Sequence, residues 1–507
     1  MNEPGWSSGY TVNQDYDYVF VPQMTPANLG FVALNQGLHA PDTGRFRYFE
    51  LGAGLGLVSL LMAATNPHAE VWANDFNPNH ALEARALAEE AGVGNFRMLE
   101  DSFEELRDRD LPEFDFIGLH GVYTWVSVEN RRRIVEFIRR RLKIGGLVYV
   151  SYNCPAGFGP LEPLRRLMNS VAAAMGGPPE RQLQQGFELL NRLGNVNARY
   201  LGLKQILPRL DQVQKKNVAF LVNDYLTRDW QLFLHTDVAK EFAEAKLCFV
   251  ASARLMDDLL PITFSNEQIE LVRQIPDRGV QENVKDFIAA RTLRTDVYAK
   301  GARRFNSPRD RLDAFLGTRF ALTQARASCG YTAKVQEREV TLLEHVHGPL
   351  LDELAKRPSA LAELIEVPLL AQLGREAVVN ALLTLLAVNY AAPYVLPEPE
   401  SKRGAMRLNH AIARRALSHR PLPCLAAPAL GSGVLVTDTS QLFVRAAYER
   451  ASLEQFALEQ MRRAGQKLLR NGKPIDSAEE TSVRLQELAA EFTEVEAPLL
   501  RQLGVLD

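Results

Sequence analysis

The chain has 507 residues, of which 46% are hydrophobic, and its formal net charge is −3 at pH 7. This length predicts two or three domains with enough buried core to fold without disulfides. A charge so close to zero gives no reason to expect nucleic acid as a partner. The four cysteines are scattered without metal-ligand spacing, so we expect no metal site and a reducing compartment, the cytoplasm. The polar start and the lack of a long apolar stretch argue against a signal peptide and membrane insertion.

Residues 1–45 come before the first strand pattern and are predicted to form an N-terminal cap. They contain Tyr16 and Tyr18, followed by a helix-like stretch that ends near Leu38. This segment is expected to lead the chain into a sheet.

Residues 48–56, Tyr-Phe-Glu-Leu-Gly-Ala-Gly-Leu-Gly, predict a short strand that runs into a glycine loop. A second apolar strand is expected to end on Asp75. A tight turn alone would account for the glycines. Because Glu50 and Asp75 both stand at strand ends, however, the pattern indicates the front edge of a nucleotide-type site in a doubly wound sheet.

The spacing of the glycines indicates which nucleotide-like cofactor binds. Gly52, Gly54 and Gly56 form GxGxG, whereas a dinucleotide fingerprint places its third glycine at the position of Leu57. A dinucleotide also needs a helix N-terminus free for its pyrophosphate. S-adenosylmethionine (SAM) has no phosphate and carries a sulfonium cation, which suits the acidic end of a strand. SAM is therefore the predicted cofactor.

The elements that follow alternate between helix and strand. We expect a helix over 80–91, a basic amphipathic helix over 130–143 that ends at a Gly-Gly pair, and three strands, over 96–99, 114–119 and 147–152. This alternation predicts an α/β fold with a Rossmann-like, doubly wound parallel sheet, joined by mostly α-helical middle and C-terminal domains. Ligands of such sheets lie beyond the carboxyl ends of the strands.

Asp101 follows the expected strand over 96–99. In this fold an acid followed by a small polar residue at that place can hold the amino group and ring edge of adenine. The alternative is that Asp101 caps the next helical turn, and the two roles can coexist.

Polar and aromatic residues also follow the strands over 114–119 and 147–152, where a methyl acceptor would approach. Methyl transfer needs an aligned acceptor with a free lone pair. His120 is a candidate proton acceptor, and Tyr123, Trp125 and Tyr152 are candidate aromatic walls that attract a cationic amine. Ordinary packing is the alternative for His120 and Trp125. The proline motif of nucleobase amine methylation is absent after 114–119.

The chain resembles the bacterial class I methyltransferases that carry a methyltransferase regulatory domain. The resemblance covers nearly the whole chain and includes the rickettsial protein lysine methyltransferases, which modify an outer-membrane surface antigen. It departs from the family pattern at Asn223-Asp224-Tyr225, where the family has His-Glu-Tyr, and in having Gly-Ala-Gly for Gly-Cys-Gly. The motifs that carry it begin at Glu50, His120, Ser151, Asp224, Phe249, Arg291, Leu408 and Pro428.

The resemblance implies a division of the chain into domains. A SAM-binding methyltransferase domain would cover 46–255, with a helical insertion at about 158–214. A regulatory-like segment over 215–330 would overlap its end. A mostly helical C-terminal domain, winged-helix-like in its pattern, would cover 331–507 and finish in two amphipathic helices, around 446–471 and 478–503.

The resemblance also implies roles for the site residues. The three loop glycines would let the backbone approach SAM, and Glu50 would orient the loop and the amino group. Asp75 would hold the ribose hydroxyls. Phe76, Asp101 and Ser102 would contact adenine. The acceptor side would consist of His120, Tyr123 and Trp125, closed by Tyr16, Tyr18 and Tyr152.

Three functions remain open at this stage. The first is methyl transfer to an acceptor amine, with a lysine of a protein, such as a surface or outer-membrane protein, as the first choice. The second is methylation of a small molecule, a metabolite or a glycan. The third is a SAM-binding interaction protein, and a homodimer is left open for each.

Overall fold

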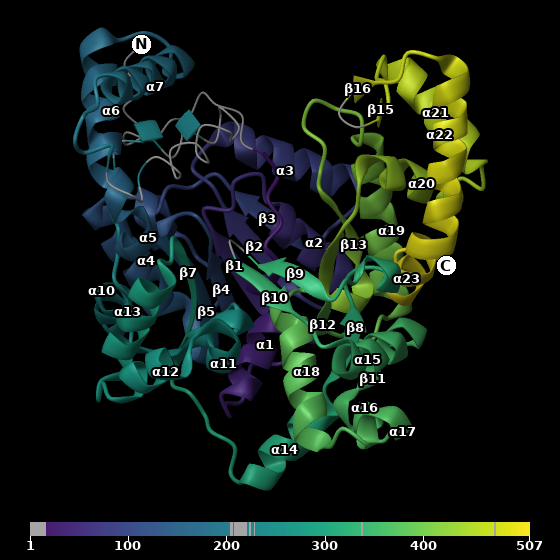
Figure 1. The fold of residues 1–507 in the computed structure, drawn as a ribbon, viewed down its shortest axis with the longest axis horizontal. Helices are drawn as coiled ribbons and strands as arrows, with labels where there is room; N and C mark the ends of the chain where they lie inside the picture. Colours follow the sequence, from purple (N-terminus) through teal and green to yellow (C-terminus); the bar gives the residue numbers. More distant parts are fainter. Residues whose placement is uncertain are drawn as a thin grey trace.

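The computed structural model describes residues 17–202, 206, 221–222, 225–227, 229–335, 338–470 and 473–507. Its centre is a seven-stranded sheet with the order β3-β2-β1-β4-β5-β7-β6 (Figure 1). The predicted α/β, Rossmann-like fold class is confirmed. The strands are β1 (Arg47–Leu51), β2 (Glu70–Asn74), β3 (Phe96–Leu99), β4 (Phe114–Leu119), β5 (Leu142–Asn153), β6 (Leu247–Ser252) and β7 (Leu293–Lys300).

The direction of the strands fixes where a ligand can bind. Strands β3, β2, β1, β4 and β5 are parallel neighbours, whereas β7 runs antiparallel between β5 and β6. The chain turns outward from β1 to β3 and then returns to place β4 beside β1. This reversal is a topological switch point, and a crevice opens there beyond the carboxyl ends of β1 and β4.

Helices cover both faces of the sheet because its strands are apolar on both sides. On one face, Tyr48 and Tyr149 pack with α2 (Leu57–Thr65), a helix in which every residue is buried. On the other face, Phe49 and Val148 pack with Ile138 of α4 (Val128–Arg141). The flanking helices are α1 (Pro26–Asn35) and α3 (Pro78–Glu90).

The Gly-Gly pair does not end the basic helix as predicted. Helix α4 ends at Arg141, and Leu142 already has extended backbone angles and begins β5. Gly146 lies inside that strand, where an added Cβ would be 2.9 Å from the carbonyl oxygen of Asp115. Close approach of the neighbouring backbone, and not a helix cap, therefore explains the glycine at 146.

The middle of the chain is a helical insertion followed by the last two strands of the sheet. β6 and β7 extend the sheet to Lys300, past residue 255, where the sequence placed the end of the methyltransferase domain. The helices of this part are α5 (Pro155–Phe158), α6 (Glu162–Met175), α7 (Pro179–Asn195), α10 (His235–Ala243), α11 (Leu260–Thr263), α12 (Asn266–Arg273) and α13 (Arg278–Ala289).

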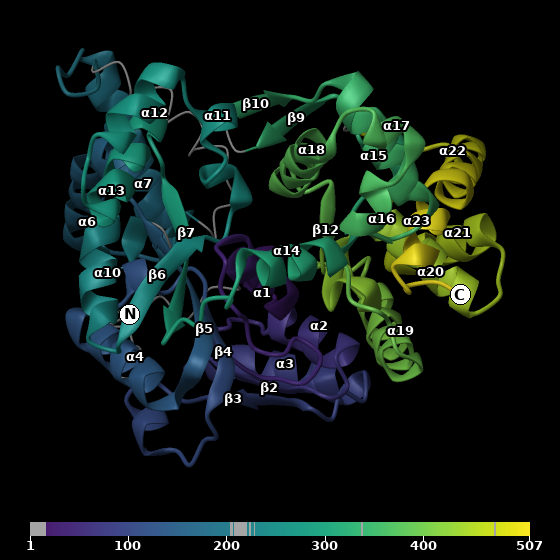
Figure 2. The ribbon, with the colours of Figure 1, turned by 90° about the horizontal axis from the view of Figure 1, so that it is seen from below.

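The C-terminal half packs directly on the sheet layer, with α1 between β6 and β12 (Figure 2). Helix α19 and the β13–β14 hairpin contact α2. The strands are β8 (Arg319–Leu322), β9 (Thr332–Val335), β10 (Arg338–Thr341), β11 (Ser359–Ala360), β12 (Ala391–Pro393), β13 (Cys424–Ala427), β14 (Ser432–Leu435), β15 (Leu469–Arg470) and β16 (Lys473–Pro474). The helices are α14 (Pro308–Gly317), α15 (Glu344–Lys356), α16 (Leu361–Ile365), α17 (Pro368–Ala371), α18 (Arg375–Ala387), α19 (Pro399–Arg414), α20 (Asp438–Tyr448), α21 (Leu453–Ala464), α22 (Ala478–Glu491) and α23 (Ala497–Gln502).

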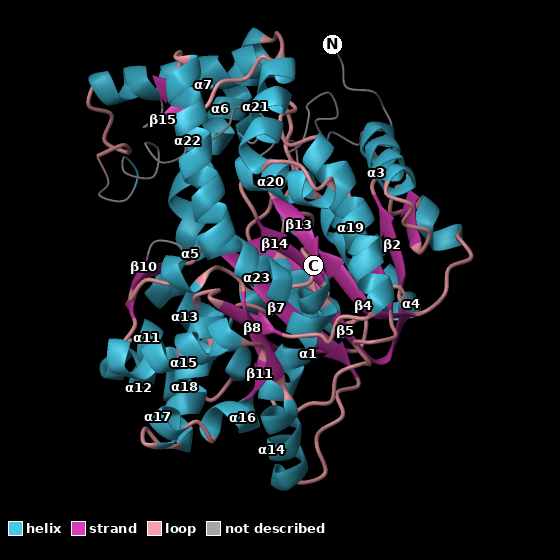
Figure 3. Ribbon diagram, turned by 90° about the vertical axis from the view of Figure 1, so that its right-hand side faces the viewer, coloured by secondary structure: helices cyan, strands magenta, loops and turns pink. Residues whose placement is uncertain are grey.

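The last helices follow the predicted pattern only in part. The expected helix over 446–471 is divided, because α20 ends at Tyr448 and α21 occupies only Leu453–Ala464 (Figure 3). Their apolar residues, such as Leu442 and Met461, belong to the same buried cluster as the sheet. In the part of the chain that the structure describes, no helix is both long and apolar enough to cross a bilayer.

Candidate cofactor and acceptor site

The loop after β1 holds its glycines in a conformation that other residues rarely adopt. Gly52, Gly54 and Gly56 have φ angles of +65°, +55° and +69°. The backbone N–H of Gly54 donates a 2.9 Å hydrogen bond to Oδ2 of Asp75, which ties the loop to the end of β2. No atom lies within 4 Å of a Cβ added to Gly54. The loop therefore presents bare backbone to an open space.

That space is a cavity of about 320 Å³, which we call the glycine-loop pocket. It lies at the switch point, beyond the carboxyl ends of β1, β2 and β4. Ten of the residues singled out from the sequence line it: Glu50, Gly52, Gly54, Gly56, Asp75, Phe76, Asp101, Ser102, His120 and Trp125.

Glu50 is a buried carboxyl in the wall of this pocket. Its side chain accepts a 2.5 Å hydrogen bond from the hydroxyl of Ser59, on the first turns of α2. Burial raises the pKa of Glu50 to about 7, against the opposing effect of the Ser59 hydrogen bond and with a further contribution from the charge of Asp75. A buried carboxylate of this kind gains from a nearby cation, and SAM carries one on its sulfur.

Asp75 is held in place by its own surroundings. Besides the Gly54 amide, its Oδ1 accepts a 3.0 Å hydrogen bond from the N–H of Asn77 and lies 3.1 Å from Nδ1 of His80. The Asn77 side chain caps α3 through the N–H of Asn79. The carboxylate is thus fixed at the mouth of the glycine loop, where a ribose of SAM would lie.

Asp101 is fixed by an arginine that the sequence did not reveal. Arg109 donates to both carboxylate oxygens of Asp101, each at 2.7 Å. The cap of the following turn is Ser102, whose hydroxyl accepts from the N–H of Glu105 at 3.3 Å, while the Glu105 carboxylate accepts from the N–H of Ser102 at 2.8 Å. Ser102, and not Asp101, therefore caps this turn.

His120 lies on the wall of the pocket between β4 and β5. Its Nδ1 is 2.9 Å from the hydroxyl of Tyr149 on β5. Burial and, secondarily, the positive charge of Arg254 lower the pKa of His120 to about 4. The imidazole is consequently neutral at physiological pH.

Tyr123 and Tyr152 are not among the lining residues of the pocket. Tyr123 is fully buried, and its hydroxyl donates to the carboxylate of Glu241 on α10. Tyr152 is buried in the same apolar cluster as Tyr123, on the face of the sheet opposite Tyr149, and its hydroxyl donates to Asp296 of β7 at 2.5 Å. Burial raises the pKa of both phenols, so they remain protonated.

The remaining aromatic candidates differ in their positions. Trp125 lines the pocket and lies 6.3 Å, centroid to centroid, from Trp230. Tyr18 donates a 3.0 Å hydrogen bond to Glu83 of α3 and does not line the pocket, and Tyr16 falls outside the described residues. Among the described residues that were expected to form aromatic walls around the acceptor, Trp125 is therefore the one that lines the pocket.

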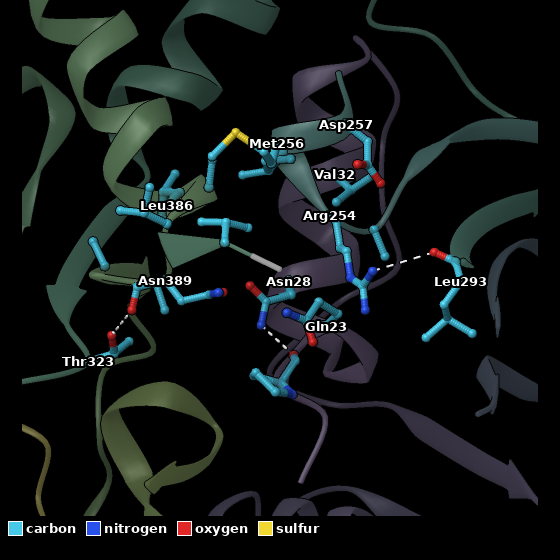
Figure 4. Close-up of a pocket in the computed structure, with 18 of the residues that line it drawn as sticks. Gln23, Asn28, Val32, Arg254, Met256, Asp257, Leu293, Thr323, Leu386 and Asn389 are labelled. Atoms are coloured by element: carbon cyan, nitrogen blue, oxygen red, sulfur yellow. Dashed lines mark hydrogen bonds between the residues drawn. The ribbon is translucent and has the colours of Figure 1, made fainter. Parts of the chain in front are cut away.

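A second cavity, of about 850 Å³, opens between the sheet and the C-terminal half (Figure 4). We call it the wide cleft. The segment 19–24 lines both cavities: Val19 and Val21 line the glycine-loop pocket, whereas Phe20 and Pro22 line the wide cleft. Polar side chains distributed around the cleft include Gln23, Asn28, Arg254, Asp257, Thr323 and Asn389.

Comparison with known proteins identifies the family to which this chain belongs. Residues 49–146 match a family described as a methyltransferase domain, and residues 217–300 match a predicted methyltransferase regulatory domain. An uncharacterised protein of Synechocystis sp. is 32% identical over 504 residues, 99% of each chain. The chain is a class I SAM-dependent methyltransferase of the family that carries this regulatory domain.

Two further likenesses come from Rickettsia. An uncharacterised protein of Rickettsia prowazekii is 28% identical over 158 residues, 30% of this methyltransferase and 63% of that protein. The structure of PKMT2 from Rickettsia typhi in complex with AdoHcy superposes with a TM-score of 0.72 and covers 97% of this chain and 100% of that one. At 14% sequence identity, that likeness establishes the shared fold.

Proposed function

We propose that this methyltransferase transfers the methyl group of SAM to a lysine amine of a protein acceptor. The observation that carries the proposal is the wide cleft beside the glycine-loop pocket. A small acceptor would favour a closed aromatic chamber over the sulfonium, yet two of the expected aromatic walls, Tyr123 and Tyr152, have their hydroxyls bonded elsewhere. The volume of the cleft, about 850 Å³, lies within the range of small-molecule sites, so its position at the junction of two halves of the chain, and not its size, is what favours a segment of a macromolecule.

The residues of the glycine-loop pocket fit SAM in this proposal. Gly54 leaves room for the methionine portion of the cofactor, and the buried charge of Glu50 is compensated by the cationic groups of SAM. Asp75 holds the ribose hydroxyls, and Phe76 packs against adenine. Asp101, with its carboxylate fixed by Arg109, accepts from the adenine amino group, and Ser102 lies beside it. Bound SAM supplies a methyl group activated by its positive sulfur.

His120 orients the acceptor amine. Because its pKa is about 4, it stays uncharged beside a sulfonium cation and does not act as a strong base. In the tautomer in which Nδ1 donates its N–H to the hydroxyl oxygen of Tyr149, the other ring nitrogen, Nε2, accepts an N–H from the amine. SAM bound in the pocket would supply its methyl group to the nitrogen lone pair, and the proton that the amine loses would pass to water in the cleft.

Trp125, Tyr123 and Tyr152 have indirect or partial roles in this scheme. Trp125 forms one wall for the aliphatic chain of the acceptor. Tyr123 joins the segment after β4 to α10 through Glu241 and so positions Trp125, and Tyr152 joins β5 to β7 through Asp296. We classify both tyrosines as positioning residues.

The proposal is tested by incubating the protein with labelled SAM and a lysate of its source cells and then separating proteins from small molecules. Label that is recovered from protein as methyl-lysine after hydrolysis supports it. Label confined to the small-molecule fraction would replace it with methylation of a metabolite or glycan. Absence of any transfer despite measurable SAM binding would favour a SAM-binding interaction protein.

A further inference from the structure

Arg254 is a cation in the wall of the wide cleft with few partners of its own. Among the residues that the structure describes, its guanidinium forms no salt bridge. Within the described part of the chain, its side chain makes one hydrogen bond, from Nη1 to the carbonyl oxygen of Leu293, which is long at 3.5 Å (Figure 4). A guanidinium has five N–H donors, so most of those on Arg254 remain for solvent or a ligand.

Two neighbouring arginines make shorter polar contacts than Arg254 does. Arg291 lies 3.0 Å from Asp257 and 3.3 Å from Asp286, and Arg278 donates to a backbone carbonyl at 2.6 Å. The single carboxylate that lines the cleft, among the described residues, is that of Asp257, and Arg291 already compensates it. With Arg254 and the exposed Lys334 also lining it, the cleft is positive overall.

The position of Arg254 brings it close to the proposed site of reaction. β7 is antiparallel to both β5 and β6, so β6 runs in the same direction as β4 and β5. Arg254 follows the carboxyl end of β6, just as His120 follows the carboxyl end of β4. Burial lowers the pKa of His120, and the positive charge of Arg254 adds to this effect; burial raises the pKa of Tyr149, and the charge of Arg254 opposes that rise.

We propose that Arg254 binds an acidic side chain of the acceptor, so that the enzyme selects lysines that have an aspartate or glutamate nearby in the protein chain. This inference rests on the proposed function and names the substrate class of the same site. A guanidinium matches a carboxylate with two parallel hydrogen bonds, which supplies orientation as well as attraction. A lysine approaching a positive cleft is repelled unless an acidic neighbour accompanies it.

Other groups of the cleft suit the backbone of such a segment. Gln23 and Asn28 lie with Arg254 on the side of the cleft formed by η2 (Pro22–Met24) and α1 (Figure 4). Asn28 donates to the carbonyl oxygen of Pro22 at 2.6 Å, which fixes its amide. The same Nδ2 donates to the Thr25 hydroxyl at 2.9 Å, so Asn28 offers its carbonyl oxygen to an N–H of the acceptor, whereas the Gln23 amide can both donate and accept. The contact between Arg254 and an acidic side chain of the acceptor therefore adds selectivity to a surface that suits an extended peptide.

The test uses two pools of short synthetic peptides with a central lysine, one with a glutamate near it and the other with glutamine at the same places. The wild-type enzyme is expected to methylate the glutamate pool with a kcat/KM about tenfold higher, the effect of one charge-assisted hydrogen bond. Arg254→Gln should abolish this preference through KM while leaving the Kd for SAM unchanged. Arg254→Glu should transfer the preference to peptides with arginine beside the lysine, which a structural defect would not do.

Arg273→Gln is the matched control, since Arg273 is exposed on α12 and lines neither cavity. It should keep the wild-type preference. Equal methylation of the two pools by the wild-type enzyme, or a preference that survives in Arg254→Gln, would overturn the inference and leave protein methylation standing. Label found only in small molecules of the lysate, with neither pool methylated, would instead remove the proposed function and the inference with it.

Discussion

Replacing Glu50 by glutamine should remove a pH dependence from SAM binding. Glu50 has a pKa of about 7 in the protein without cofactor, raised chiefly by burial. If the cations of SAM require the carboxylate, each molecule that binds SAM at lower pH must first lose a proton. The Kd of the wild-type protein is then expected to rise about 50-fold as the pH falls from 7 to 5. Calorimetry in buffers of different ionisation heat should record release of nearly one proton on binding at pH 6.

The same substitution should change stability in the opposite direction from affinity. Because the folded-state pKa of Glu50 lies above the ordinary value of 4.5, the folded protein favours the neutral carboxyl, and its stability falls as the pH rises from about 4.5 to 7. Full ionisation of Glu50 lowers the free energy of unfolding of the wild-type protein by about 3 kcal/mol, and glutamine avoids this loss. The substitution also weakens the hydrogen bond from Ser59, which cancels about 1 kcal/mol of that gain. Glu50→Gln should therefore be about 2 kcal/mol more stable than wild type at pH 8, without SAM, while binding SAM more weakly. A proton release and pH profile that persist in Glu50→Gln would refute this reasoning.

Five further substitutions test other parts of the structure. Gly52→Ala puts a Cβ 2.6 Å from Val122, so it should lower the melting temperature more than Gly54→Ala, whose Cβ meets no protein atom and should mainly weaken SAM binding in a titration. Asp75→Ala should raise the Kd for SAM by about tenfold or more, as expected for the loss of hydrogen bonds to a charged group. Tyr123→Phe should leave that Kd unchanged and lower kcat, and equal loss of SAM binding in these two variants would contradict their roles. Arg294→Met removes a fully buried cation from Asp296, Asp286 and Glu282 and should destabilise the fold by about 3–5 kcal/mol in denaturant unfolding.

Local patterns in the sequence predicted the framework of the site well. β3 and β4 occupy the expected residues, and α3 begins two residues before the expected start at 80. The glycine loop, Glu50 and Asp75 could be located because each stands at a strand end, and the carboxyl ends of parallel strands meet at one edge.

Contacts between distant segments were beyond the sequence. Ser59 holds Glu50 and Arg109 holds Asp101, yet neither has a spacing that marks it as a partner. Tyr152 was singled out because it stands at the end of the strand expected over 147–152, and Tyr149 was not considered. The two tyrosines are three residues apart, however, and therefore point to opposite faces of the strand, so that Tyr149 and not Tyr152 contacts His120.

The segment that matches the predicted regulatory domain, 217–300, is part of the catalytic sheet. It supplies β6 and β7, and it contributes Arg254 to the wide cleft. It also contains the buried ionic cluster around Arg294, whose carboxylate partner Asp296 binds Tyr152 of β5. Separation of this segment from the rest would leave β5 as an unpaired edge and expose buried charges, both at considerable cost. Release of this segment as a separate domain would therefore require the central sheet to break between β5 and β7.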